Sequence, residues 1–425
     1  MKNYLILKKY CKNILLVGSG NFWYEQNMIG DDKSVGYRAY SFALLFTYGL
    51  MTVLEILAAL RGHFPEDEQR DAVTFAVSHT IVMIKIFSVI TKKSIIKDLN
   101  HKMVVLCEHY EEESLMKEKY KAIKMNVVAY FVAVYGSAAC FVFEGLRKVY
   151  DGSHFVAVVT YYPSFDDDST LATCFRIGTT VVLYLMLMTM IVSVDSFSLT
   201  HLVMYKYKFI TLRHYLEGLR LEFDRMVEAG DQETAELKLA EGLVEGIEMH
   251  EKLLRLSKDI DRAFGLVIAL QLCQSSGSAV SLLLQIAIVS IYLLNFNTLI
   301  VIVHSLIDCL QLSDDLTYIA IMKIILFVAG LFLLLALFLC NAGEITYQAS
   351  LLSDAMFYCG WHLCSFRQLS APRHNVRRLV LLGVMQAQRP LLMKAFNMLQ
   401  LTYATFLLVV RGTYSVFALF YTQNK

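Results

Sequence analysis

Residues 263–307 read AFGLVIALQLCQSSGSAVSLLLQIAIVSIYLLNFNTLIVIVHSLI and contain no Asp, Glu, Lys or Arg. As one helix this stretch would be about 68 Å long at 1.5 Å per residue, more than twice the roughly 30 Å thickness of a bilayer's hydrocarbon core. An uncharged run of this length is typical of a chain that is surrounded by lipid. We expect it to hold one membrane-spanning helix that ends at the polar cluster Asn295, Asn297 and Thr298, followed by a turn.

The composition of the whole chain agrees with a lipid environment. Of the 425 residues, 56% are hydrophobic and 18% are charged, whereas about a quarter of the residues in a soluble domain are charged. The mean hydropathy is +0.49. The net charge of +1 gives no strong field that would attract nucleic acid. Membrane lipid is therefore an expected partner, and nucleic acid is not.

Seven stretches are long and apolar enough to cross a bilayer as helices, which satisfy their own backbone hydrogen bonds in lipid. They are residues 35–60, 72–90, 125–146, 171–194, 263–296, 316–340 and 399–421. All four prolines fall between these stretches, as expected for helix breakers. The sequence predicts an all-α integral membrane protein with seven transmembrane helices.

Loop charges predict the orientation of these spans. Lys and Arg are abundant before span 1 and between spans 2 and 3, 4 and 5, and 6 and 7. The alternate loops are acidic or lack Lys and Arg, as in the run from Asp166 to Asp168. Because positive loops stay in the cytosol, we expect a cytosolic N-terminus and an extracellular C-terminus. A G-protein-coupled receptor has the reverse orientation, so no G protein is expected to be required.

The spans and loops divide the chain into six expected parts. Between spans 4 and 5, apolar residues recur at spacings of three and four on both sides of Gly230 and Asp231, which predicts an antiparallel pair of cytosolic helical extensions. The parts are 1–34, a cytosolic or membrane-surface segment; 35–203, helices 1 to 4 with a ligand pocket; 204–262, the cytosolic extensions; 263–340, helices 5 and 6; 341–398, a cytosolic anchor region; and 399–425, helix 7.

Motifs for catalysis or metal binding are missing from the sequence. There is no P-loop, GxSxG or HExxH motif, and Gly18-Ser19-Gly20 lacks the third glycine of a dinucleotide fingerprint. His304 and Asp308 are four residues apart, but two ligands do not make a metal site. The nine cysteines are scattered and are interpreted as structural thiols. We expect no enzymatic activity, no cofactor and no metal.

Four ionisable residues lie inside the predicted spans, where each costs a few kcal/mol (about 2.5–3.5 at the helix centre) unless it is paired or hydrated. Glu55 and Lys85 lie towards the outer and inner ends of spans 1 and 2, so we expect both to reach the membrane surface. Lys323 either pairs with an acid, faces a hydrated cavity or marks a misplaced span boundary. The fourth is Arg411.

Aromatic, Met and small residues are frequent in the outer halves of spans 2, 3, 4 and 6, a composition suited to an adaptable apolar pocket for a small lipophilic ligand. Packing between helices is the alternative for each residue alone. The candidate ligand-binding residues are Phe75, His79, Met83, Tyr135, Gly136, Ala139, Phe143, Thr179, Tyr184, Met188, Tyr318 and Met322.

The last quarter of the chain resembles the C-terminal signature of the insect odorant receptors. Ser350-Leu351-Leu352-Ser353-Asp354-Ala355 with Trp361 is similar, with small shifts, to the pattern S-x-x-L-x-D-A-x-Y-x-x-x-W. Gln386-Ala387-Gln388-Arg389-Pro390 resembles the A-Q-R-P element, and Thr413-Tyr414-Ser415-Val416-Phe417-Ala418-Leu419 resembles T-Y-S-x-F-x-L. The elements occur in the family's order, which is more specific than any one of them.

This resemblance implies an odorant-gated nonselective cation channel in the plasma membrane of a sensory neuron dendrite. It also implies a heterotetramer in which a ligand-binding tuning subunit joins a co-receptor subunit, and a small volatile ligand. Related gustatory receptors place Gln-Phe after the Thr-Tyr, where this chain has Phe420-Tyr421, and the co-receptor has a longer loop between spans 4 and 5. A gustatory-type channel or a secondary transporter is the alternative, although a transporter is expected to have internal repeats and broken spans.

In such a tetramer, the last helix would surround a central pore. A stripe at spacings of three and four includes Thr413, Phe417, Phe420 and Asn424, and together with Val416 these are the candidate pore and gate residues. Rings of bulky apolar side chains close a pore by dewetting. Contact with lipid or with other helices is the alternative for this stripe.

Overall fold

The computed structural model describes residues 3–25, 28–62, 66–150, 170–303, 311–364, 376–396 and 398–423. Side chains within these ranges are described except at 66–68, 70, 71, 148, 172, 176, 179, 284–303, 311–324, 376, 420, 421 and 423.

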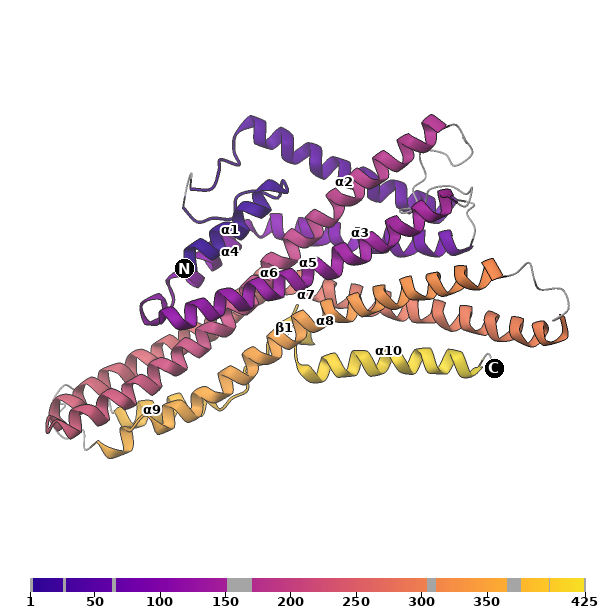
Figure 1. Cartoon of the computed structure of the whole chain (residues 1–425). Helices are drawn as coiled ribbons and strands as arrows, with labels where there is room; N and C mark the ends of the chain where they lie inside the picture. Colours follow the sequence, from indigo (N-terminus) through magenta and orange to yellow (C-terminus); the bar gives the residue numbers. More distant parts are fainter. Residues whose placement is uncertain are drawn as a thin grey trace.

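Helices dominate the described chain (Figure 1). Six of them are long and apolar enough to cross a membrane, and the shorter apolar helix at Tyr403–Leu419 adds a seventh candidate. The predicted all-α membrane fold is therefore confirmed. The elements are α1 (Asn3–Leu16), α2 (Val35–Arg61), α3 (Glu66–Thr91), α4 (Lys93–Val105), η1 (Glu108–Tyr110), α5 (Glu113–Tyr150), α6 (Thr170–Glu228), α7 (Gln232–Val303), α8 (Gln311–Tyr358), η2 (Trp361–Leu363), α9 (Val376–Ala387), β1 (Lys394–Ala395), β2 (Leu399–Gln400) and α10 (Tyr403–Gln423).

The longest helices, α6 and α7, form an antiparallel pair that extends beyond the other spans at the lower left of Figure 1. The turn between them contains Gly230 at φ +85°, a conformation that favours glycine. Two more glycines let the helices approach closely, since a Cβ at Gly242 would lie 2.5 Å from Leu219 Cδ2, and Gly246 faces Leu216. The predicted pair is thus continuous with the spans before and after it.

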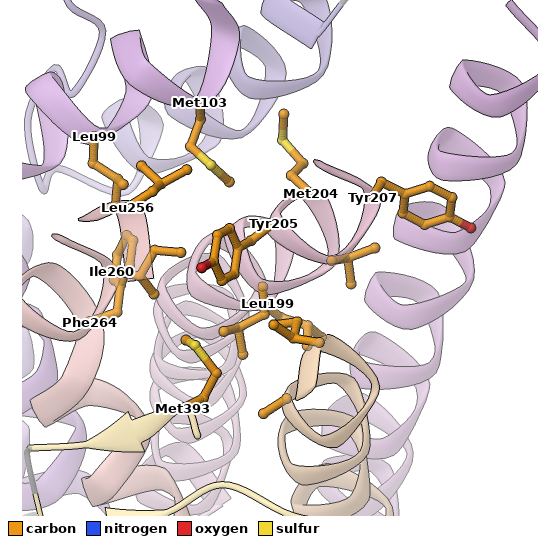
Figure 2. Packing of buried hydrophobic residues seen from close by; sticks show 14 of the residues in the cluster. Leu99, Met103, Leu199, Met204, Tyr205, Tyr207, Leu256, Ile260, Phe264 and Met393 are labelled. Carbon is orange, nitrogen blue, oxygen red and sulfur yellow. The ribbon is translucent and has the colours of Figure 1, made fainter. Parts of the chain in front are cut away.

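A continuous apolar core joins the helices near the base of this pair. Figure 2 shows Leu99 and Met103 of α4, Tyr205 of α6 and Phe264 of α7 converging, with Met393 beside them. All five side chains are buried, and the Tyr205 hydroxyl donates to the carbonyl oxygen of Leu253 at 2.8 Å. Buried tyrosine needs such a partner. The core fixes α4, α6, α7 and the segment before β1 relative to one another.

A buried cluster of charges ties α1 to the helices next to it. Glu111 accepts from Lys208 Nζ at 2.8 Å, from Lys119 Nζ at 2.5 Å and from the Asn3 amide at 2.9 Å. The side chains of Glu111, Lys119 and Lys208 are at most 1% exposed. Burial raises the pKa of Glu111, but Lys208 and Lys119 outweigh it, so that the pKa lies below its usual value. Glu111 is therefore held as a carboxylate between two lysines.

The last helix begins later than the sequence predicts. Residues Leu399 and Gln400, expected at the start of span 7, pair instead with Lys394 and Ala395 in a two-stranded antiparallel ladder. Thr402 then caps α10 by accepting from the amide of Thr405 at 3.1 Å, as an N-cap residue does. Apolar composition alone did not distinguish strand β2 from the helix, so the boundary at 399 was wrong.

The helix of span 5 is longer than the predicted span. Helix α7 continues through Asn295, Asn297 and Thr298 as far as Val303. A helix satisfies its backbone groups whatever its side chains are, so three polar residues do not end it. Helix α10 contacts both α7 and α8, and it lies beside them at the lower right of Figure 1, with the C-terminus at the opposite side of the view from the N-terminus.

Candidate functional site

Lys85 lies within α3 with its side chain 1% exposed, so the expectation that it reaches the membrane surface was wrong. Its ammonium contacts Asp195 Oδ2 of α6 at 3.1 Å. It also donates to Gln271 Oε1 and, at 3.3 Å, to Gln274 Oε1 of α7. Burial of a charge within a span requires such partners. One cation therefore links three helices.

Further hydrogen bonds extend this network. The Tyr130 hydroxyl of α5 donates to Asp195 Oδ2 at 2.5 Å, and the Gln271 amide donates to Ser275 Oγ at 3.1 Å. Among the described residues, Asp195 Oδ1 has no hydrogen-bond partner although it is buried. Four helices thus meet at a compact polar centre, which we call the Lys85 network (Lys85, Tyr130, Asp195, Gln271, Gln274 and Ser275).

Glu55 is also buried rather than positioned to reach the membrane surface. Its side chain is 0% exposed, and its Oε2 lies 2.6 Å from Nδ1 of His79, which is 2% exposed. The contact joins α2 to α3. This contact uses Nδ1, so Nε2 is the ring nitrogen that it leaves for a different partner.

A small cavity of about 80 Å³ lies between α3, α5, α6, α7 and α8, and both polar groups border it through His79, Tyr130, Gln271 and Gln274. An apolar protein cavity of about 150 Å³ suffices to bind benzene, so this one is small. Its lining comprises Thr74, Phe75, Ser78 and His79; Tyr130, Val134, Ser137 and Phe141; Tyr184, Met188 and Ile191; Gln271, Gln274, Ser278 and Leu282; and Phe327, Leu331 and Leu334.

Aromatic rings form the apolar wall of the cavity. Phe75 is central: its ring centroid lies 5.8 Å from that of His79 in a stacked arrangement and 5.0 Å from that of Phe141, edge to face. Tyr184 meets Phe75 at 6.4 Å, and Phe327 meets Phe141 at 5.2 Å, both edge to face. Such pairs are the favoured geometries of aromatic contacts. The lining therefore combines a set of contacting aromatic rings, which we call the aromatic wall, with amide and hydroxyl groups.

Four of the predicted ligand-binding residues line this cavity: Phe75, His79, Tyr184 and Met188. Met83 instead faces α2, with its Cε 3.6 Å from the Cβ position of Gly49. Tyr135 contacts the Thr189 hydroxyl at 2.8 Å and does not line the cavity. Gly136, Ala139 and Phe143 are exposed on the outer face of α5. The side chains of Thr179, Tyr318 and Met322 lie outside the described residues, as does that of Lys323.

Three polar residues of the lining, Tyr130, Gln271 and Gln274, were not predicted from the sequence. Asp195, which directly follows the predicted end of span 4, was not predicted either. The signal that could have indicated Asp195 was Lys85, because a lysine inside a span needs an acidic partner. Asp195 is the acidic residue that the structure places beside this lysine.

Helix α10 turns one side towards its own subunit. Thr413 is 3% exposed and donates to the carbonyl oxygen of Val409, whereas Val416 and Phe417 are half-buried. Tyr414 is 66% exposed, with its ring 6.4 Å from that of Phe417. Arg411 is exposed. The Phe420 side chain and Asn424 lie outside the described residues.

Two larger grooves lie near the α6–α7 pair. One, of about 600 Å³, lies between the segment 101–110 and α7, and one of about 750 Å³ lies between α7 and residues 386–394. Both carry several charged side chains, including Lys252 in the first and Arg389 in the second, which does not suit an apolar ligand. Within the described part of the chain, no group of three potential ligands is arranged to hold a metal ion.

The fold defines a multi-pass helical membrane protein, and a small internal cavity lies between its helices. The family model described as 7tm Odorant receptor matches residues 67–414, and the chain belongs to this family. The structure is similar to that of the insect olfactory receptor OR5 from Machilis hrabei, with a TM-score of 0.71 and 14% identity over 98% of this chain and 99% of that chain. It is also similar to the same receptor in complex with eugenol, with a TM-score of 0.68 and 14% identity over 99% of each chain. Among curated protein sequences, none matches this chain.

Proposed function

We propose that this protein is the ligand-binding subunit of an odorant-gated nonselective cation channel. A small volatile compound would bind in the cavity between α3 and α8 and favour an open state in which α10 lines a central pore. The observation that carries the proposal is the cavity itself, since it is enclosed by aromatic side chains inside a chain of the odorant receptor family.

The cavity's contents support a small lipophilic ligand. Phe75 and Tyr184 supply flat apolar surface, and Met188 supplies a flexible side chain that adapts to ligand shape. Because the volume is only about 80 Å³, binding of most volatiles requires side chains such as Met188 to move. The structural relative that was solved with eugenol is consistent with a volatile aromatic ligand.

The exposed side of α10 supports a role in the pore. Tyr414 and the neighbouring Phe417 lie one turn apart with part of each ring accessible, and four copies around an axis would form apolar rings that exclude water. Thr413 and Val416 would position this surface, and Phe420 and Asn424 would continue it outward. A ligand opens such a pore only if it binds the open state more tightly than the closed one.

The resemblance to the family supports a heterotetramer with a co-receptor in the plasma membrane of a sensory neuron dendrite, with no G protein in the signalling step. The orientation that the loop charges predict, with the N-terminus in the cytosol, is part of this proposal.

Whole-cell recording with a panel of volatiles that includes eugenol tests the proposal. When a ligand is applied, we expect a cation current in cells that contain both this chain and a co-receptor. We expect no current in cells that contain either subunit when no ligand is present. A ligand response that requires G-protein turnover and persists without ion flux through the complex would overturn it.

A further inference from the structure

The Lys85 network orients one hydrogen-bond donor towards the cavity. Lys85 Nζ contacts the side-chain oxygens of both Gln271 and Gln274, and an amide whose oxygen is fixed has its nitrogen on the opposite side. The Gln271 nitrogen already donates to Ser275. Among the described residues, the Gln274 nitrogen has no partner, and Gln274 lines the cavity.

Two hydroxyl groups of the cavity lining are already engaged. The Tyr130 hydroxyl donates to Asp195, and the Ser137 hydroxyl donates to the carbonyl oxygen of Val134 at 2.8 Å. Lys85 itself is surrounded by Asp195, Gln271 and Gln274. Of the groups that the Lys85 network and Ser137 contribute to the lining, the Gln274 amide is the one whose N–H remains for a ligand.

We propose that the cavity selects neutral volatile ligands that carry a hydrogen-bond acceptor, above all a carbonyl oxygen, which accepts from Gln274 Nε2. The apolar part of the ligand lies against Phe75, Phe141 and Tyr184, which are on the aromatic wall. Lys85 and Asp195 are positioning residues, since they hold the Gln274 amide with its donor facing the ligand. This inference rests on the proposed function only in assuming that the ligand occupies this cavity.

The network matters because a glutamine amide alone has no preference for a donor or an acceptor. A free amide rotates to present either end, so it would pair with a ligand that offers only a donor as well as with one that offers only an acceptor. A lysine on its oxygen removes that choice, because the ammonium only donates. A ligand that offers only a donor then leaves the Gln274 nitrogen unpaired, and an unpaired buried polar group weakens binding.

Matched ligand pairs test the inference. Methyl ketones from 2-pentanone to 2-nonanone are each compared with the 2-methyl-1-alkene in which a methylidene group replaces the oxygen, and acetophenone is compared with α-methylstyrene. Binding is measured as the thermal stabilisation of the purified complex in nanodiscs, and gating is measured as current. For Gln274→Met we expect the ketone-to-alkene affinity ratio to fall about three- to tenfold, the range for one net hydrogen bond, with alkene affinity unchanged.

Three further variants separate the donor from general packing. Ser276→Ala is the control, because Ser276 is on the same helix, donates to the carbonyl oxygen of Leu272 and does not line the cavity; its ratio should match the wild type. Gln274→Glu keeps an oxygen near Lys85 but removes the amide donor, and it serves if Gln274→Met does not fold. In Lys85→Met/Asp195→Asn, the lysine no longer holds the amide oxygen, so the ketone-to-alkene affinity ratio should fall in the same direction as in Gln274→Met.

The outcomes distinguish this inference from the proposed function. A ratio that is unchanged in Gln274→Met, a fall of equal size in Ser276→Ala, or the absence of stabilisation by every ketone and alkene would each overturn the ligand class. Ketone-dependent stabilisation without any current in the presence of a co-receptor would support the ligand class and overturn the channel.

Discussion

Removing the charge of Lys85 should destabilise the protein strongly, and removing the charge of Asp195 as well should restore most of the loss. The two side chains are each 1% exposed and 3.1 Å apart. Breaking a buried ion pair by deleting one partner costs about 3–5 kcal/mol. Asp195 would keep the Tyr130 hydroxyl, so we expect about 3 kcal/mol for Lys85→Met. In Lys85→Met/Asp195→Asn no charge remains unpaired, and the loss should be below about 1 kcal/mol.

The free energy of unfolding is measured by SDS titration of the purified protein in mixed micelles, for both single variants and the double variant. The coupling energy of this cycle should be about 2–3 kcal/mol. Arg255→Met is the control, because Arg255 and Glu251 form an exposed pair with side chains 75% and 61% exposed, and such pairs contribute about 1 kcal/mol at most. Losses from the two single variants that simply add in the double variant would refute the reasoning.

Three more predictions concern other parts of the molecule. Glu111→Gln should lower the free energy of unfolding by about 3–5 kcal/mol, because it leaves Lys119 and Lys208 without their carboxylate, and it should speed hydrogen exchange in α1. Because the pKa of Glu111 is lowered from 4.5, the stability that its carboxylate contributes is present above that pH and is lost as the pH falls below it. A melting temperature that does not change on acidification would contradict this. Phe417→Ala should raise the leak current without ligand or change permeation, and neither change would argue against a gate there. Asp261→Ala removes the acceptor for the Phe396 amide; the maximal current should fall at unchanged ligand affinity, with the exposed Lys258→Ala as control, and an equal fall in that control would count against a specific role.

The sequence predicted those features that follow from local composition. The apolar lengths of the spans gave the helical membrane class, and Gly230 with Asp231 gave the turn between α6 and α7 because that position requires an unusual backbone conformation. The ordered elements between Ser350 and Leu419 predicted the family, which the family model over residues 67–414 confirms. Each of these signals lies within a short segment and needs no knowledge of its neighbours.

The faces of the helices could not be predicted in the same way. On α5 the cavity is lined by Tyr130, Val134 and Phe141, whereas the predicted Gly136 and Phe143 lie on the outer surface. In water, an apolar stripe marks the face that packs inside. In lipid, both faces are apolar, since the outer one contacts hydrocarbon and no hydrophobic contrast separates them. Periodicity therefore gave the helix but not its rotation.

Helix α7 connects the cavity to the start of α10. Gln274 borders the cavity, and Asp261, about 20 Å away along the same helix at 1.5 Å per residue, accepts from the amide of Phe396 in the β1–β2 hairpin that leads into α10. Gly265 also lies close to this hairpin, since a Cβ there would be 3.0 Å from the Phe396 nitrogen. A close-packed interior transmits small displacements rather than absorbing them. If ligand binding moves α7 at Gln274, that movement reaches the proposed pore helix through the direct contacts between α7 and α10 and through the hairpin. The hydrogen bond between Asp261 and Phe396 belongs to the hairpin route, and Asp261→Ala tests how much of the coupling uses that route.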